Sequence, residues 1–172
     1  MTALLLVRHG ETDWNADGRL QGQTDRPLSD FGRRQAQRLA DELADEELEA
    51  IYASDLSRAR QTAEILGGRL GLAIVLDPDL REKDWGTWEG LTAIERDRVE
   101  FVGESTEAHQ ERILRALSRI AERHPGGRVL VVTHGGSMRR AQTAALGMAM
   151  PVVENCGRWL CAWENGSFRA LD

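Results

Sequence analysis

Two unbroken hydrophobic runs, at 4–7 and 129–132, are each followed by one polar residue and then by His-Gly. No polar residue alternates with the apolar ones inside either run, which is typical of strands buried on both faces. The residue after such a strand emerges at the carboxyl edge of a sheet, where open α/β folds bind their ligands. We therefore expect His9 and His134 to face one crevice if the two strands are neighbours.

Between and after these runs, apolar residues at helical spacing alternate with further short apolar segments. The helices predicted are one that follows the N-cap Ser29 and reaches Leu43, one from a Ser54 or Asp55 cap to Leu70, one around 113–121 that ends by 125–127, and one over 137–146. The other strands predicted are 50–53, 74–76 and a hairpin of 158–164 and 167–171 that turns at Asn165-Gly166. This alternation predicts one domain over residues 1–172, with a three-layer α/β/α architecture and a mainly parallel central sheet.

Two segments show no clear period and are predicted to be irregular. Residues 13–28 are rich in Asp, Gly, Gln and Thr, so we expect a long surface loop, and such loops often carry function. Residues 77–103 contain Trp85 and Trp88 between glycines and carboxylates. These tryptophans, together with Trp14, are expected either to form an apolar wall beside a ligand or to join the core.

Composition and charge narrow the class of protein. The chain is 41% hydrophobic and 29% charged, as ordinary folded proteins are, and its net charge of −6 argues against a nucleic-acid binder. The first apolar run is too short for a signal peptide or a membrane span, and Cys156 and Cys161 are expected to be reduced structural thiols. We therefore expect a cytoplasmic protein that does not bind membranes. Its oligomeric state is left open, a homodimer included.

The candidate chemistry points to an anion and away from a metal. Arg58 falls in the first turn of a predicted helix, and a helix N-terminus combined with an arginine suits an anionic ligand. The four histidines show no spacing typical of metal ligands, so we expect neither a metal nor another cofactor. His109 and His124 lie at the two ends of the amphipathic helix, where solvated or capping roles are expected.

Taken together, the motifs resemble those of the histidine phosphatase superfamily, also called phosphoglycerate-mutase-like, and of its phosphatase branch. The resemblance rests on Arg8-His9-Gly10-Glu11-Thr12 with Trp14-Asn15, on residues 54–63, 80–90 and 103–105, and on Thr133-His134-Gly135-Gly136. These motifs occur in the order expected of the family and extend over nearly the whole chain.

The resemblance implies a role for each matching residue. His9 corresponds to the nucleophile that becomes transiently phosphorylated, and Glu82 corresponds to the proton donor. Arg8, Arg58 and His134 match the phosphate pocket. The positions implied to line the substrate site are Asn15, Gln21, Gly22, Gln23, Thr24 and Gly135. These residue types suit phosphoryl transfer, because guanidinium groups bind phosphate with paired donors and nearby cations favour a neutral, nucleophilic imidazole.

The cover over the implied site is short. Only residues 91–102 separate Gly90 from Gly103, where broad-specificity phosphatases and mutases usually carry a longer helical insertion. A shortened cap leaves a phosphohistidine open to water, which favours hydrolysis. We therefore expect a metal-independent phosphomonoesterase whose partner is a small phosphorylated metabolite. The alternatives left open are a cofactor-dependent phosphoglycerate mutase, an α-ribazole phosphatase, a protein phosphohistidine phosphatase and a non-catalytic phospholigand-binding module.

Overall fold

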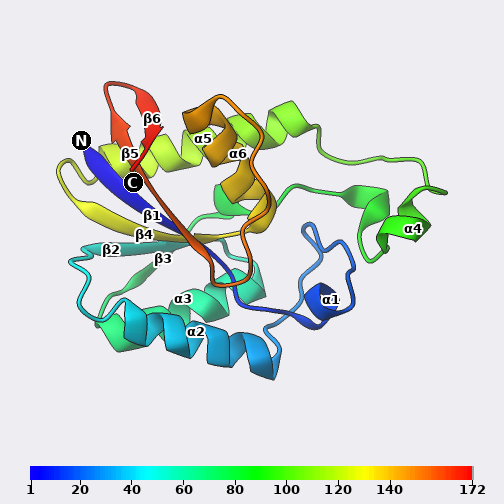
Figure 1. Cartoon of the computed structure of the whole chain (residues 1–172), viewed down its shortest axis with the longest axis horizontal. Helices are drawn as coiled ribbons and strands as arrows, with labels where there is room; N and C mark the ends of the chain where they lie inside the picture. The colour runs from blue at the N-terminus through cyan, green and yellow to red at the C-terminus, as the bar shows by residue number, and fades with distance from the viewer. Residues whose placement is uncertain (172) are drawn as a thin grey trace.

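A twisted six-stranded sheet runs through the middle of the computed structural model, which describes residues 1–171 (Figure 1). The strands are β1 (Thr2–Arg8), β2 (Ala50–Ala53), β3 (Ile74–Leu76), β4 (Arg128–Thr133), β5 (Arg158–Glu164) and β6 (Ser167–Ala170), in the spatial order β3-β2-β4-β1-β5-β6. The pairs β1–β4, β2–β4 and β2–β3 are parallel, whereas β5 runs antiparallel to both β1 and β6. The predicted, mainly parallel sheet is confirmed.

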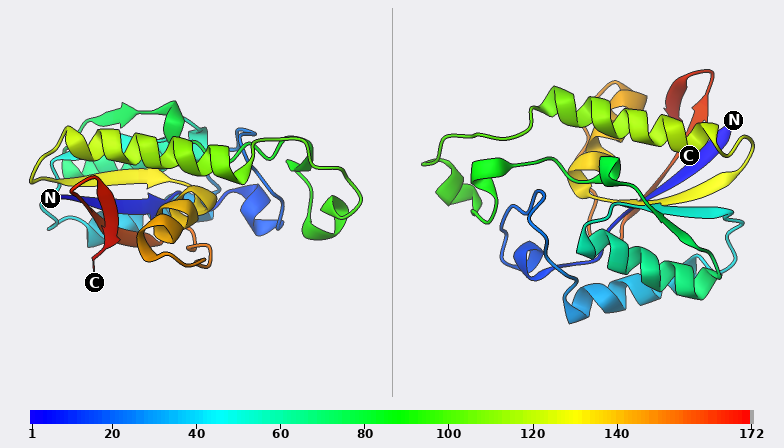
Figure 2. Two further views of the ribbon diagram at one scale, coloured as in Figure 1. Left: turned by 90° about the horizontal axis from the view of Figure 1, so that it is seen from above. Right: turned by 180° about the vertical axis from the view of Figure 1, so that it is seen from behind.

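Helices cover both faces of this sheet, which gives the three layers seen in Figure 2. The helices are α1 (Asp13–Ala16), α2 (Asp30–Glu42), α3 (Ser57–Leu70), α4 (Ala93–Arg96), α5 (Thr106–Glu122) and α6 (Gly135–Leu146), with short 3₁₀ turns η1 (Pro78–Leu80) and η2 (Gly86–Trp88). In Figure 1, α2 and α3 lie on one face and α5 and α6 on the other. Within residues 1–171, no helix has both the length and the apolar character needed to cross a bilayer.

Strand β1 is buried on both faces, as its unbroken apolar run predicts. Leu4 and Leu6 belong to the core cluster beneath α5 and α6, and Leu5 and Val7 belong to the cluster that packs against α2 and α3. Successive side chains of a strand point to opposite faces, so one strand serves both cores. This double burial holds the end of β1, and the residues that follow it, in a fixed position.

Strands β1 and β4 are direct neighbours in parallel register. Leu4 pairs with Val129, and Arg8 pairs with Thr133. Both strands therefore end at the same level of the same sheet edge, so that the two His-Gly pairs lie side by side. The expectation that they share one edge is confirmed.

The boundaries of several elements follow local sequence signals. Ser29 caps α2, since its hydroxyl accepts a hydrogen bond from the N–H of Gly32, and Ser105 caps α5 in the same way. Asn165 and Gly166 both have positive φ, at 53° and 78°, as the tight turn between β5 and β6 requires. The predicted cap at Ser29 and the predicted turn at Asn165-Gly166 are confirmed.

Other boundaries were predicted wrongly. Leu56, and neither Ser54 nor Asp55, occupies the N-cap of α3, and its side chain makes no capping hydrogen bond. Helix α6 begins two residues before its predicted start. The long loop expected over 13–28 is interrupted by α1, because Thr12 and Asn15 form a reciprocal capping box.

Candidate active site

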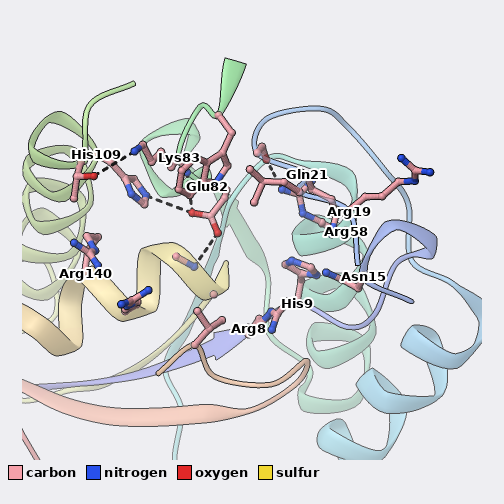
Figure 3. Close-up of a pocket in the computed structure, with 18 residues that line it drawn as sticks. Arg8, His9, Asn15, Arg19, Gln21, Arg58, Glu82, Lys83, His109 and Arg140 are labelled. Atoms are coloured by element: carbon pink, nitrogen blue, oxygen red, sulfur yellow. Dashed lines mark hydrogen bonds and ion pairs between the residues drawn. The ribbon is translucent and has the colours of Figure 1, made fainter. Parts of the chain in front are cut away.

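A cavity of about 400 Å³ opens at the sheet edge where β1 and β4 end (Figure 3). Its walls come from the end of β1, the residues around α1, the start of α3, the segment 82–85, and helices α5 and α6. Of the residues implied by the resemblance, those that line it are Arg8, His9, Asn15, Gln21, Gly22, Arg58, Glu82 and Gly135. The structure thus brings most of the expected set together around one space.

His9 is held in the form that a nucleophile needs. Its ring nitrogen Nδ1 lies 2.7 Å from the carbonyl oxygen of Gly10, and a carbonyl can only accept, so Nδ1 carries the proton. The other nitrogen, Nε2, then keeps its lone pair. Burial, together with the charges of Arg58 and Arg8, holds the pKa of the His9 imidazole well below its usual 6.5. The ring is therefore neutral at neutral pH.

The backbone of Gly10 holds the turn that carries His9 in place. Its N–H donates to the hydroxyl of Thr62 at 3.0 Å, and that hydroxyl donates to the carbonyl of Arg58 at 2.7 Å. A Cβ on Gly10 would collide with the backbone of Gly32 at the start of α2. The glycine therefore allows α2 to pack closely against the turn that carries His9.

Two arginines line the cavity, of which Arg58 is buried and Arg8 is half-buried. Arg8 donates through NH1 to the carbonyl of Val153 at 2.7 Å, and Arg58 donates to the carbonyls of Gly22 and Thr24 at 2.6 and 3.1 Å. Within residues 1–171, the Nε atom of neither arginine has a hydrogen-bond partner. Burial lowers the pKa of Arg58 to about 10, so it still carries its charge at neutral pH. Both guanidinium groups are thus positioned to bind an anion.

Two side-chain amides complete a ring of donors. The Asn15 Oδ1 accepts from the N–H of Thr12 at 3.1 Å and from the amide of Asn155 at 3.2 Å. The Gln21 Oε1 accepts from the hydroxyl of Thr12 at 2.9 Å. Because both oxygens are occupied, the NH₂ groups of these two lining residues remain available as donors, and Figure 3 shows Asn15 beside His9. Such a ring of donors fits the oxygens of a phosphate.

Gln23 and Thr24 do not line the cavity, although the resemblance implied that they would. Their backbone N–H groups donate to the carboxylate of Glu89 at 2.8 and 2.7 Å, and the carbonyl of Thr24 receives a donor of Arg58. This loop therefore holds Arg58 in place and leaves contact with the ligand to Gln21 and Gly22.

His134 lies behind His9 and outside the cavity lining. It is completely buried, the two ring centroids are 5.2 Å apart, and its Nε2 lies 2.9 Å from the hydroxyl of Ser54. Within the described chain its Nδ1 has no hydrogen-bond partner. Burial and the charge of Arg58 hold the pKa of His134 well below 6.5.

Glu82 enters the cavity from the segment after η1 and faces the His9 side (Figure 3). One carboxylate oxygen accepts from the N–H of Lys83 and the other from the N–H of Gly136, both at 2.8 Å. A Cβ on Gly136 would collide with this carboxylate, so a larger residue at this position would force the Glu82 side chain to move. The two backbone donors fix the orientation of the Glu82 carboxylate in the cavity.

His109 lines the cavity, although the sequence interpretation did not place it there. A solvated or capping role was expected, but the side chain is only 2% exposed and lines the cavity. Its Nε2 lies 3.1 Å from the hydroxyl of Ser137 and 3.6 Å from the Glu82 carboxylate. The sequence contains one signal of this burial. His109 lies four residues before Ile113 and therefore shares the buried face of α5.

Comparison with known proteins agrees with this geometry. The model of the "Histidine phosphatase superfamily (branch 1)" matches residues 4–170. The chain belongs to this superfamily. The expected membership is confirmed over nearly its whole length.

Relatives of this histidine phosphatase include two proteins of Arabidopsis thaliana. "Phosphoglycerate mutase-like protein 4" is 39% identical over 79% of this chain and 67% of its own length. "Metal-independent phosphoserine phosphatase" is 39% identical over 81% of this chain and 66% of its own length. The chain thus spans about two thirds of each plant protein.

Solved structures extend the likeness to the whole fold. "Bacillus stearothermophilus YhfR" superposes with a TM-score of 0.91 at 34% identity, over 99% of this chain and 95% of the other. A phosphoserine phosphatase from Entamoeba histolytica, in complex with 3-phosphoglyceric acid, superposes with a TM-score of 0.87 at 25% identity, over 100% and 96%. Some structural relatives are therefore bound to small phosphorylated acids.

The buried histidines of this histidine phosphatase predict a loss of stability below pH 6.5. Because folding lowers the pKa values of His9 and His134, the unfolded chain binds more protons than the folded protein as the pH falls through that range. The free energy of unfolding therefore decreases. Each histidine should lower the free energy of unfolding by about 1.4 kcal/mol between pH 7.5 and 5.5. Urea unfolding at both pH values measures this change. The His9→Asn protein should lose about 1.4 kcal/mol less, and an equal loss would contradict the assignment.

Proposed function

We propose that this enzyme hydrolyses phosphomonoesters of small metabolites, without a metal, through a phosphohistidine at His9. One observation carries the proposal. The unprotonated Nε2 of a buried, neutral His9 shares a cavity with Arg8 and Arg58, whose Nε groups have no partner in the described chain. A neutral nucleophile beside two fixed cations suits attack on a phosphate ester.

In the first step, Nε2 of His9 attacks phosphorus as the ester P–O bond breaks on the opposite side. Negative charge spreads over the three equatorial oxygens, where Arg8, Arg58, Asn15 and Gln21 donate hydrogen bonds. The leaving alkoxide needs a proton, which the protonated Glu82 carboxyl supplies as the bond breaks. The products of this step are an alcohol, a phosphohistidine and a Glu82 carboxylate.

In the second step, Glu82 accepts a proton from a water molecule that attacks the phosphohistidine. The P–N bond breaks, inorganic phosphate leaves, and His9 and Glu82 return to their starting forms. The backbone donors of Lys83 and Gly136 support this double use, because they keep the carboxylate in one orientation through both steps.

A mutase would return the phosphoryl group to the same substrate and would need water kept out. The segment 91–102 contains only the single-turn helix α4, which supports access of water and hence hydrolysis. Incubation with 3-phosphoglycerate and 2,3-bisphosphoglycerate, with separate assays of phosphate and 2-phosphoglycerate, tests this choice. We expect phosphate to accumulate, and a faster formation of 2-phosphoglycerate would reject the hydrolase.

Phosphate release from a panel of other phosphoesters separates the remaining alternatives. A panel of phosphoserine, α-ribazole phosphate, a phosphohistidine protein and p-nitrophenyl phosphate covers a small acid, a nucleotide-like ester, a protein and a general substrate. Release of phosphate from small esters at the highest kcat/KM supports the proposal. If none of these is hydrolysed, the phospholigand-binding module becomes the favoured alternative.

A further inference from the structure

A buried histidine of helix α5 faces the carboxylate of Glu82. The side chain of His109 lines the cavity, and its Nε2 lies 3.6 Å from Oε1 of Glu82, a contact drawn as a dashed line in Figure 3. At 3.6 Å the two atoms are too far apart for a hydrogen bond, but such contacts tighten when a substrate is bound. The reaction steps given above assign no part to this ring.

The hydrogen bonds of Ser137 place a proton on Nε2 of His109. The Ser137 hydroxyl donates to the carbonyl oxygen of Arg81 at 3.2 Å, and it lies 3.1 Å from Nε2. A hydroxyl has one hydrogen, so towards Nε2 it acts as the acceptor and Nε2–H is the donor. The carboxylate of Glu82 favours the same tautomer, because it would repel an Nε2 lone pair. An N–H group is therefore directed at this pair of oxygens.

The surroundings of His109 keep the ring neutral. Burial is the main cause that lowers the pKa of His109, and the charges of Arg112 and Arg140 lower it further. The carboxylates of Glu82 and Glu104 act in the opposite direction without overcoming burial. A neutral ring can donate a hydrogen bond to a carboxylate and still keep its own proton.

Helix α5 also holds the backbone of Glu82. Arg112 lies three residues after His109 on the same side of the helix, and it donates to the carbonyls of Arg81 and Glu82 at 2.9 and 3.2 Å. Its guanidinium group is paired with the Glu104 carboxylate at 2.8 Å. One helix therefore fixes both the peptide that carries Glu82 and the ring that faces its carboxylate.

We propose that His109 is a positioning residue for Glu82, and that its Nε2–H binds the carboxylate formed when Glu82 gives its proton to the leaving group. The inference rests on the proposed function, because only a proton donor at Glu82 becomes charged in the first step. In that step the carboxyl O–H bond breaks, the proton joins the leaving oxygen, and negative charge develops on the carboxylate. A hydrogen bond from Nε2–H stabilises this charge as it develops, and His109 keeps its own proton throughout.

Two aryl esters of matched shape test the inference. The leaving group of phenyl phosphate needs a proton far more than that of p-nitrophenyl phosphate does. The ratio of their kcat/KM values reports this need, because kcat/KM covers the steps up to the phosphoenzyme. His109→Leu removes the donor and keeps a buried, apolar side chain. We expect this variant to lower the ratio of phenyl to p-nitrophenyl phosphate by about tenfold, as the loss of a hydrogen bond to a charged group does.

His109→Gln is the conservative variant, because the amide NH₂ of glutamine can replace Nε2–H as a neutral donor. Its ratio should stay within about threefold of the wild-type ratio. The matched control is His124→Leu, since His124 lies outside the cavity and contacts Tyr52 and Glu49. If His109→Leu slows both esters equally, with folding verified by circular dichroism, the ring has only a structural role and the inference is overturned. A ratio as low in His109→Gln as in His109→Leu would also overturn it.

A double variant shows whether His109 acts through Glu82. When Glu82→Gln has already removed the carboxyl group, the further change His109→Leu should leave the ratio as it is, whereas independent roles would add. ¹⁵N NMR of the His109 ring provides a measurement that does not depend on activity. We expect the proton on Nε2, and a proton on Nδ1 alone would reject the proposed donor.

Failure of this inference and failure of the proposed function give different results. If the wild-type protein hydrolyses no phosphoester, the proposed hydrolase is wrong and the inference falls with it. If both aryl esters are hydrolysed and His109→Leu keeps the wild-type ratio, the hydrolase stands and only the role of His109 is rejected.

Discussion

Replacing His9 by alanine is expected to lower kcat/KM for phosphomonoesters by about four orders of magnitude or more. The variant lacks the imidazole whose Nε2 keeps a free lone pair and whose pKa is lowered by burial and by the charges of Arg58 and Arg8. Phosphate release measures the loss, and acid quenching with a ³²P-labelled substrate shows whether the acid-labile phosphoenzyme has disappeared.

His124→Ala is the matched control for this experiment. His124 lies outside the cavity, where it contacts the Tyr52 hydroxyl at 3.1 Å and the Glu49 carboxylate at 2.7 Å. We expect this variant to retain turnover and to form the phosphoenzyme. Residual activity of His9→Ala near the level of the control would show that another residue is the nucleophile.

Replacing Glu82 by glutamine should slow alkyl phosphoesters by about 10²–10⁴-fold, the usual contribution of general acid–base catalysis. Glutamine has nearly the same size but cannot transfer a proton. p-Nitrophenyl phosphate has a leaving group that hardly needs one, so its hydrolysis should slow far less. Steady-state rates on both kinds of substrate, together with the exposed control Glu64→Gln on α3, measure the difference.

Equal slowing of both substrates would remove the acid role from Glu82. The carboxylate would then act through orientation alone, since it also joins the N–H groups of Lys83 and Gly136. Its position would still be explained, because those two donors come from the segment after η1 and from the first turn of α6. Only the contrast between leaving groups distinguishes the two roles.

The parts of the fold that could be predicted from sequence depend on strong local signals. Residues 4–7 and 129–132 are apolar without interruption, and such strands have few places in a fold other than the centre of a sheet. When two such strands are central and run parallel, their His-Gly ends lie at the same edge of the sheet. Asn165 and Gly166 are equally decisive, because few residue pairs adopt positive φ twice in succession.

The parts that could not be predicted depend on packing between distant segments. Ser54 has the chemistry of an N-cap, but its hydroxyl contacts His134 from the neighbouring strand end, and Asp55 pairs with Arg81. His109 lies on an apolar helix face, and only the position of α6 shows that this face meets a cavity rather than solvent. Local propensity carries no information on these contacts between distant segments.

The place of β1 between β4 and β5 has a consequence for how the enzyme is made. During synthesis β1 precedes both of its neighbouring strands, which are complete only when residues 128–133 and 158–164 have been added. Until then His9 and Arg8 are exposed to solvent at the end of an apolar strand with two unpaired edges, which is a state prone to association with other chains. The cavity at the end of β1 therefore cannot form until both neighbouring strands are in place.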